Sequence, residues 1–176
     1  GTVSNLPIGH NFIKWEVKDE CDNISECCTR VTVRDEILPT AVCHLNTVVS
    51  IAANQQAIVF ASSFDDGSHD NCAIRDIEVR KTVNSCTAGN TLFAKQAIFC
   101  CDEIGQEIMV EMKVTDVHGN MNTCMVRATV QDKLNPYIKC PPNITLDCQA
   151  DYEDLDITGE PSAVDNCSVK DVVKAD

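Results

Sequence analysis

The fold is decided by the stretch Glu107-Ile-Met-Val-Glu-Met-Lys-Val-Thr115, in which apolar and polar side chains alternate. Successive side chains of a β-strand point to opposite faces, so this alternation predicts a strand with one buried face. β-prone runs recur at 13–18, 43–51, 57–61, 77–82, 96–100 and 124–130. No segment carries an apolar stripe of helical period. Short strands separated by Gly, Asn and Asp turns predict an all-β chain of immunoglobulin-like antiparallel sandwiches.

The alternation belongs to a longer repeat, because landmarks on either side of it recur at a fixed offset. The pairs that lie 97 positions apart are Asp19 and Asp116, Asn23 and Asn120, Cys27 and Cys124, Val33 and Val130, Asp35 and Asp132, Pro39 and Pro136, and Cys43 and Cys140. Asp70-Asn71-Cys72 returns as Asp165-Asn166-Cys167, at an offset of 95. Several landmarks in one register indicate a tandem repeat of one supersecondary unit.

The repeat boundaries fall at Pro39 and Pro136, each shortly after a repeated aspartate, Asp35 or Asp132. The predicted units are the C-terminal part of a preceding repeat (1–39), a complete repeat (40–136) and the N-terminal part of a following repeat (137–176). A partial sandwich leaves an apolar face open. The terminal pieces therefore belong to a longer chain, or neighbouring copies complete one another in a head-to-tail polymer.

Composition places the chain outside the cytoplasm. It has 12 cysteines but no C-x-x-C pair, which favours structural disulfides over zinc sites. The formal charge of −13 argues against nucleic acid as a partner, because phosphates would repel the chain. No apolar run is long enough for a signal peptide or a membrane span, and the chain begins with Gly1. We expect a secreted or cell-surface protein.

The landmarks resemble the hyalin repeat, an immunoglobulin-like module of animal extracellular proteins and large bacterial surface proteins. The matching positions are Asp116, Gly119, Asn120, Cys124, Val130, Asp132, Pro136, Cys140, Pro141, Asn143, Asp165, Asn166 and Cys167. With Phe99-Cys-Cys-Asp102, the central repeat is most similar to repeat-rich surface proteins of Bacteroidota. The resemblance implies an extracellular spacer or adhesion module. The chain departs from the pattern at Asp22, where a glycine is usual, and in its extra cysteines.

Four sets of disulfides are predicted. Cys43 and Cys124 open the first and last strands of the central repeat on its inward face, so we expect them to pair. Cys72 and Cys86 would each take one of Cys100 and Cys101, in an order the sequence leaves open. Local bonds are expected between Cys148 and Cys167 and between Cys21 and Cys28. By analogy with the first pair, Cys27 and Cys140 would find partners outside this sequence.

A dense group of oxygen ligands lies in the segment Asp65-Asp66-Gly-Ser-His-Asp70-Asn71. Calcium takes six to eight such ligands, so Asp65, Asp66, Asp70 and Asn71 are candidate calcium ligands, and calcium is the one cofactor considered. The alternative is that these side chains form turns by bonding their own backbone. Asp35 and Asp132 could instead place a cation between repeats. Asp19 and Asp116 are interpreted as turn-formers.

Function follows from these features as an expectation. Short connections at Pro39 and Pro136 suit a stalk, fibre or surface filament, whose partners would be neighbouring repeats or copies of the chain. His69 and Cys72 lack the arrangement of an activated nucleophile, so we expect no enzymatic activity. The alternatives are a carbohydrate- or protein-binding module and an accessory domain of a large secreted enzyme. Aromatic residues that could stack on sugars are few.

Overall fold

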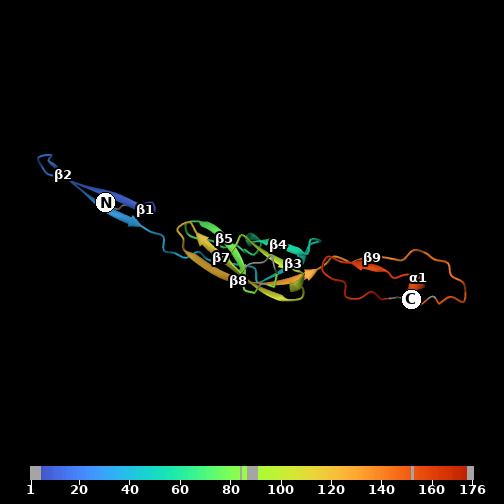
Figure 1. Cartoon of the computed structure of the whole chain (residues 1–176). Coiled ribbons are helices and arrows are strands. Elements are labelled where there is room, and N and C mark those ends of the chain that lie inside the picture. Colours follow the sequence, from blue (N-terminus) through green and yellow to red (C-terminus); the bar gives the residue numbers. More distant parts are fainter. Residues whose placement is uncertain (1–4, 84, 87–90, 152, 174–176) are drawn as a thin grey trace.

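The computed structural model describes residues 5–83, 85–86, 91–151 and 153–173. This described part is all-β, apart from two 3-10 turns and one short helix. It divides along the chain into an N-terminal hairpin (β1 and β2), a central body (β3 to β8) and a C-terminal segment (residues 137–173). The three lie in a row, with the central body in the middle (Figure 1).

The central body has two sheets. Its strands are β3 (Asn46–Ile51), β4 (Gln56–Phe60), β5 (Ile74–Lys81), β6 (Gln96–Cys100), β7 (Glu107–Asp116) and β8 (Met121–Asp132). One sheet has four strands in the order β3-β8-β7-β5, and the other pairs β4 with β6. All neighbours are antiparallel except β3, which runs parallel to β8.

Both sheets contribute to one apolar core. The alternation predicted for β7 is confirmed, since Val110, Met112 and Val114 are fully buried. Phe99 of β6 packs in the same core from the second sheet, and Phe64 packs there from the loop after β4. The sequence pattern of one strand thus identified the inner face of the larger sheet.

The first predicted strand of the central repeat begins later than expected. β3 starts at Asn46, and Leu45, which lies within the predicted run 43–51, is 79% exposed. Cys43 instead forms an isolated bridge with Asp65, and the His44 N–H donates to the Phe64 carbonyl at 3.0 Å. Because the chain here pairs with a loop and only then joins β8, the strict alternation of side chains is lost.

The N-terminal hairpin pairs β1 (Gly9–Lys18) with β2 (Ile24–Val33). Two apolar residues of the predicted run 13–18 are exposed: Trp15 is 49% exposed and Val17 is 69% exposed. Their counterparts in β7, Met112 and Val114, are fully buried. The pattern of the strand is therefore the same, but among the described residues no second sheet covers this face of the hairpin.

The turns that close the two hairpins are built alike. Asp19 Oδ1 accepts from the N–H groups of Cys21 and Asn23, at 2.8 and 2.9 Å. Asp116 Oδ1 accepts from the N–H groups of His118 and Asn120, also at 2.8 and 2.9 Å. Both aspartates thus form turns, as the sequence predicted. The left-handed position is taken by Gly119 (φ 95°) in one turn and by Asp22 (φ 68°) in the other.

One buried ion pair lies beneath β6. Lys81 Nζ is 2.7 Å from Glu103 Oε1, and the two side chains are 1% and 0% exposed. Lys81 Nζ also lies 5.1 Å from the centre of the Phe99 ring. A buried pair of this kind must remain intact, because either charge alone would be expensive in an apolar core.

The C-terminal segment has little regular structure. A short pair joins β9 (Tyr137–Lys139) to β10 (Ser162–Val164), and between them lies the single-turn helix α1 (Leu155–Thr158). Across the described chain, no helix is long and apolar enough to cross a bilayer.

Candidate functional site

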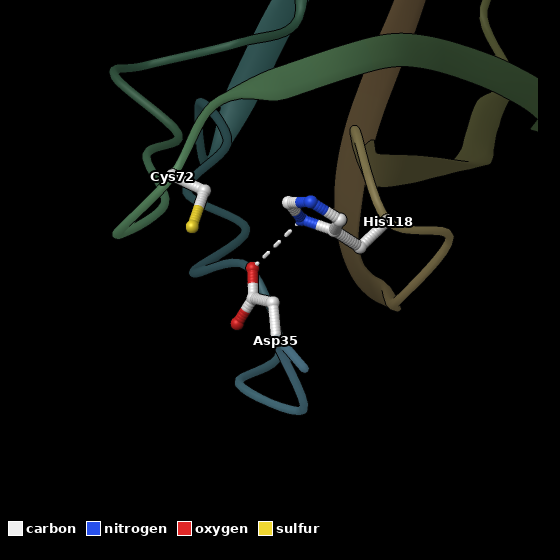
Figure 2. Close-up of side chains that lie close together, drawn as sticks. All are labelled: Asp35, Cys72 and His118. Carbon is white, nitrogen blue, oxygen red and sulfur yellow. Dashed lines mark hydrogen bonds and ion pairs between the residues drawn. The ribbon is translucent and has the colours of Figure 1, made fainter. Parts of the chain in front are cut away.

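A polar cluster forms where the N-terminal hairpin meets the central body, around Asp35. Asp35 follows β2, Cys72 precedes β5, and His118 lies in the turn between β7 and β8. Figure 2 shows the imidazole of His118 and the sulfur of Cys72 both directed toward the Asp35 carboxylate. His118 Nδ1 lies 3.1 Å from Asp35 Oδ2, and the Asp35 side chain is only 2% exposed. The fold therefore brings together three side chains that are far apart in sequence.

Further hydrogen bonds fix Asp35 against the central body. Its Oδ1 accepts from Asn71 Nδ2 at 3.3 Å and from the Ile37 N–H at 3.2 Å. Its backbone carbonyl accepts from Asn120 Nδ2 at 3.2 Å. Asn71 and Asn120 both recur as landmarks of the sequence repeat. These hydrogen bonds therefore connect the end of the hairpin to positions that are repeated within the chain. We call residues 34–40 the first junction.

The Asp35–Cys72–His118 group does not form an activated nucleophile. A hydrogen bond with the Cys72 thiol lowers the pKa of Asp35, burial opposes this, and bonds from Ile37, Asn71 and His118 add to the lowering. The same bond to Asp35, together with burial and nearby carboxylates, raises the pKa of Cys72. Nucleophilic cysteines need a lowered thiol pKa, because the thiolate is the reactive form. The geometry instead holds a protonated thiol beside an ionised carboxylate.

Two more carboxylates reach the same place. Single oxygen atoms of Asp35, Asp70 and Asp116 all lie within 4.8 Å of one another. Burial raises the pKa of Asp116, but hydrogen bonds from Asn120, His118 and Gly119 outweigh it, so the pKa is lowered. Three carboxylates therefore share one end of the central body. Asp116 is both a turn-former and a member of this cluster, and its turn role alone was evident from sequence.

The four candidate calcium ligands are not brought together. Asp65 Oδ1 accepts from the Ser68 N–H at 3.0 Å, which is turn chemistry. The Asp66 side chain is 59% exposed and lies 3.7 Å from His44. The segment that carries them runs alongside residues 40–43. Of the four, Asp70 joins the carboxylate cluster, and Asn71 bonds to Asp35 beside it.

Three disulfides are formed among the described residues. The predicted bond between Cys43 and Cys124 is present, and so is one of the two predicted alternatives for Cys86, its bond to Cys100. The third joins Cys101, just after β6, to Cys167 in the C-terminal segment. Cys167 packs against the core of the central body. This third bond links the central body to the C-terminal segment.

The third bond corrects two predicted pairings. Cys167 is bonded to Cys101 and not to Cys148, which has a free thiol. Cys72 has no partner among Cys100 and Cys101, because both are bonded elsewhere. The physical reason is position: Cys72 lies at the end of the central body that faces the hairpin, whereas Cys101 lies at the end that faces the C-terminal segment.

The predicted bond between Cys21 and Cys28 is also wrong, since both thiols are free. Cys21 lies in the turn, whereas Cys28 lies inside β2, opposite Lys14. A strand rises about 3.3 Å per residue, so the four residues from Ile24 to Cys28 separate them by roughly 13 Å. Two cysteines whose Cα atoms are more than about 7 Å apart cannot be bridged without moving the backbone. Cys27 and Cys140 are free as well.

The connection between the central body and the C-terminal segment repeats the local bonds of the first junction. We call residues 131–137 the second junction. The Leu134 N–H donates to Asp132 Oδ1 at 3.0 Å, as Ile37 does to Asp35. The Cys167 N–H donates to Asp165 Oδ2 at 3.4 Å, as Cys72 does to Asp70. The equivalent residues therefore adopt the same local conformation twice.

No protein-family model matches this chain, and a search of curated proteins finds no match either.

Proposed function

We propose that this chain is part of an extracellular structural or adhesive fibre, built from tandem immunoglobulin-like modules of the hyalin-repeat type. The observation that carries the proposal is the disulfide between Cys101 and Cys167, which joins consecutive repeats covalently. Such a bond would let the boundary between two repeats carry tension along a stalk without relying on packing alone.

The disulfides shorten the path along which tension can travel. Along the backbone, Cys167 lies 124 residues after Cys43. Through the bonds Cys43–Cys124 and Cys101–Cys167, the covalent path contains only the 23 residue-to-residue steps from Cys124 back to Cys101. Most of the central body therefore cannot be drawn out while the disulfides are intact. This limit on extension is the mechanism that we propose for the module.

Three further observations agree with a module in a row. The topology pairs a four-stranded with a two-stranded sheet around one core, as in immunoglobulin-like sandwiches. The hairpin, central body and C-terminal segment lie in line (Figure 1). Asn120 Nδ2 donates to the Asp35 carbonyl at the first junction, and both residues belong to the repeated landmarks of the sequence. The proposed role is non-catalytic, and the proposed partners are neighbouring repeats or copies of the chain.

The exposure of Trp15 does not favour sugar binding over this role. Trp15 is exposed on the hairpin, but its counterpart Met112 is fully buried in the complete sandwich. The face that carries Trp15 is therefore a core face left without its second sheet. A sugar-binding platform would instead place aromatic rings on an outer face.

Electron microscopy of the natural, non-recombinant material tests the proposal. We expect long fibres with a regular axial repeat of one or two modules, still intact in the absence of reductant. Dispersed globular particles or short rods without a repeat would overturn the fibre. Such particles would favour a binding module or an accessory domain of a larger secreted protein.

A further inference from the structure

We propose that the carboxylates of Asp35, Asp70 and Asp116 hold one calcium ion at the first junction. Oxygen atoms of the three lie within 4.8 Å of one another. They come from three separate segments: the end of the hairpin, the loop before β5, and the end of β7. The site would therefore contain ligands from both sides of the junction.

Hydrogen-bond donors surround two of these carboxylates, but no cationic side chain other than His118 lies beside them among the described residues. The Asp116 residue is 0% exposed and the Asp35 side chain 2% exposed. Within the described residues, no lysine or arginine forms an ion pair with any of the three carboxylates, and of the basic side chains His118 alone contacts Asp35. Carboxylates removed from water need an opposite charge or a dense set of donors. A divalent cation would supply that charge at the point where the three converge.

An unpartnered oxygen points independently to a ligand. Asp70 Oδ2 accepts from the Cys72 N–H at 2.9 Å, but Asp70 Oδ1 is shielded from solvent and has no hydrogen-bond partner. Leaving a buried acceptor unsatisfied is costly, and such atoms in native proteins call for an explanation. Coordination to a cation would satisfy this oxygen.

The same oxygen is unpartnered at the second junction. Asp165 Oδ1, the counterpart of Asp70 Oδ1, is also shielded and without a hydrogen-bond partner, and so is Asn166 Oδ1. The recurrence at equivalent positions makes the feature a property of the repeat. Among the described residues, three carboxylates converge only at the first junction, so we expect one complete site there.

The donor set favours calcium over zinc. Calcium takes six to eight oxygen ligands at 2.3–2.6 Å in irregular geometry, and waters can complete the set that three carboxylates begin. A zinc alternative exists, because Asp35, Cys72 and His118 also converge. A structural zinc site has four protein ligands and takes cysteine as thiolate. Here only three residues of that kind converge among the described residues.

The calcium ion would fix the hairpin relative to the central body. Asp35 is the one ligand from the hairpin side, and Asp70 and Asp116 are held in the central body by their own loops and turns. Binding would thus stiffen the junction. This consequence rests on the proposed fibre function, whereas the binding itself does not.

Calorimetric titration of the whole chain with calcium chloride, after treatment with chelator, tests the site. We expect one ion per chain, with a Kd of about 10⁻⁴–10⁻³ M, the range of extracellular calcium modules. Asp70→Asn and Asp35→Asn each keep the shape of the side chain but remove one ligand charge. Each should weaken binding by about tenfold or more. Asp66→Asn removes the same charge from the exposed neighbouring loop and should leave the affinity unchanged.

The outcomes separate the alternatives. Thermal melting in chelator, with the three disulfides verified by mass, shows whether each variant is folded. If folded wild-type chain takes up no calcium at 10 mM, or if Asp66→Asn weakens binding as much as Asp70→Asn, the site is wrong. A chain that binds zinc tightly but not calcium, and loses zinc binding in Cys72→Ser, would also contradict the proposal. The metal ligands would then be Asp35, Cys72 and His118. Fibre formation is measured separately by microscopy, so failure of one proposal leaves the other standing.

Discussion

Cys101 and Cys167 are 66 residues apart and bonded to each other, so the end of β6 is joined directly to the following repeat. The equivalent of Cys167 at the first junction is Cys72, whose thiol is free. The position 97 residues before Cys101 is Ser4, and residues 1–9 contain no cysteine. The two junctions therefore share their hydrogen bonds, but one of them lacks the covalent link.

Force spectroscopy, with handles attached next to Cys43 and next to Cys167, should measure the length of the covalent path between these two residues. In oxidising buffer the maximum extension between these positions should be about 80–90 Å, because an extended residue spans at most about 3.6 Å and the path contains 23 residue-to-residue steps. After reduction, the 124-residue backbone should extend to about 450 Å. Equal extension before and after reduction would contradict the proposed mechanism, and Cys86→Ser serves as control because its bond lies off this path.

Replacement of Lys81 by methionine should destabilise the central body by about 3–5 kcal/mol, because it leaves the Glu103 carboxylate buried without its partner. The double variant Lys81→Met with Glu103→Leu should recover most of that loss, measured by denaturant unfolding. Glu107→Gln breaks the half-exposed pair with Arg127 and should cost less than about 1 kcal/mol. A fully additive double variant would show that the two buried groups do not interact.

Truncation of Met112 and of Trp15 to alanine compares equivalent positions in a covered and an uncovered sheet. Met112→Ala should lower the unfolding free energy of the central body by about 2–5 kcal/mol, since it leaves a cavity in a packed core. Trp15→Ala should change that transition little, because the side chain is half exposed on the hairpin. A large effect of Trp15→Ala would mean that the exposed face is covered in solution, by a second copy of the chain.

Alkylation of Cys72 should require higher pH than that of an ordinary thiol. A raised pKa leaves less thiolate at a given pH, so the rate should rise with pH and reach its plateau later. Asp35→Asn removes the largest cause of the shift and should move the pH profile to lower pH. Peptide mapping by mass spectrometry separates Cys72 from the other free cysteines, and an unmoved profile would show that Asp35 does not control the thiol.

The sequence predicted the side-chain alternation of β7 and the two aspartate turns, which are local in the chain. The alternation in β7 identified the buried face of the larger sheet, because side-chain period alone determines which residues of a strand share a face. The repeated aspartates predicted the two turns, since a carboxylate that bonds the next few N–H groups acts within one short segment. The predicted run 43–51 begins before β3 because Cys43 and His44 pair with a distant loop, which a local pattern does not record.

The pairing of cysteines depended on the tertiary structure. Cys43 and Cys124 could be predicted because both mark strands of one repeat. Cys167 seemed to need a local partner, yet its partner lies in the preceding repeat. Sequence distance says little about spatial distance once strands have been paired and repeats placed in line.

By itself, the sequence determined the all-β class, the register of the repeat and the turn at each repeated aspartate, because each depends on neighbouring residues and on side-chain period. The tertiary structure alone decided that Asp35, Asp70 and Asp116 meet, and that Cys101 reaches Cys167. Those contacts join segments from different repeats, and their geometry is set by how the sheets pack and how each junction directs the chain.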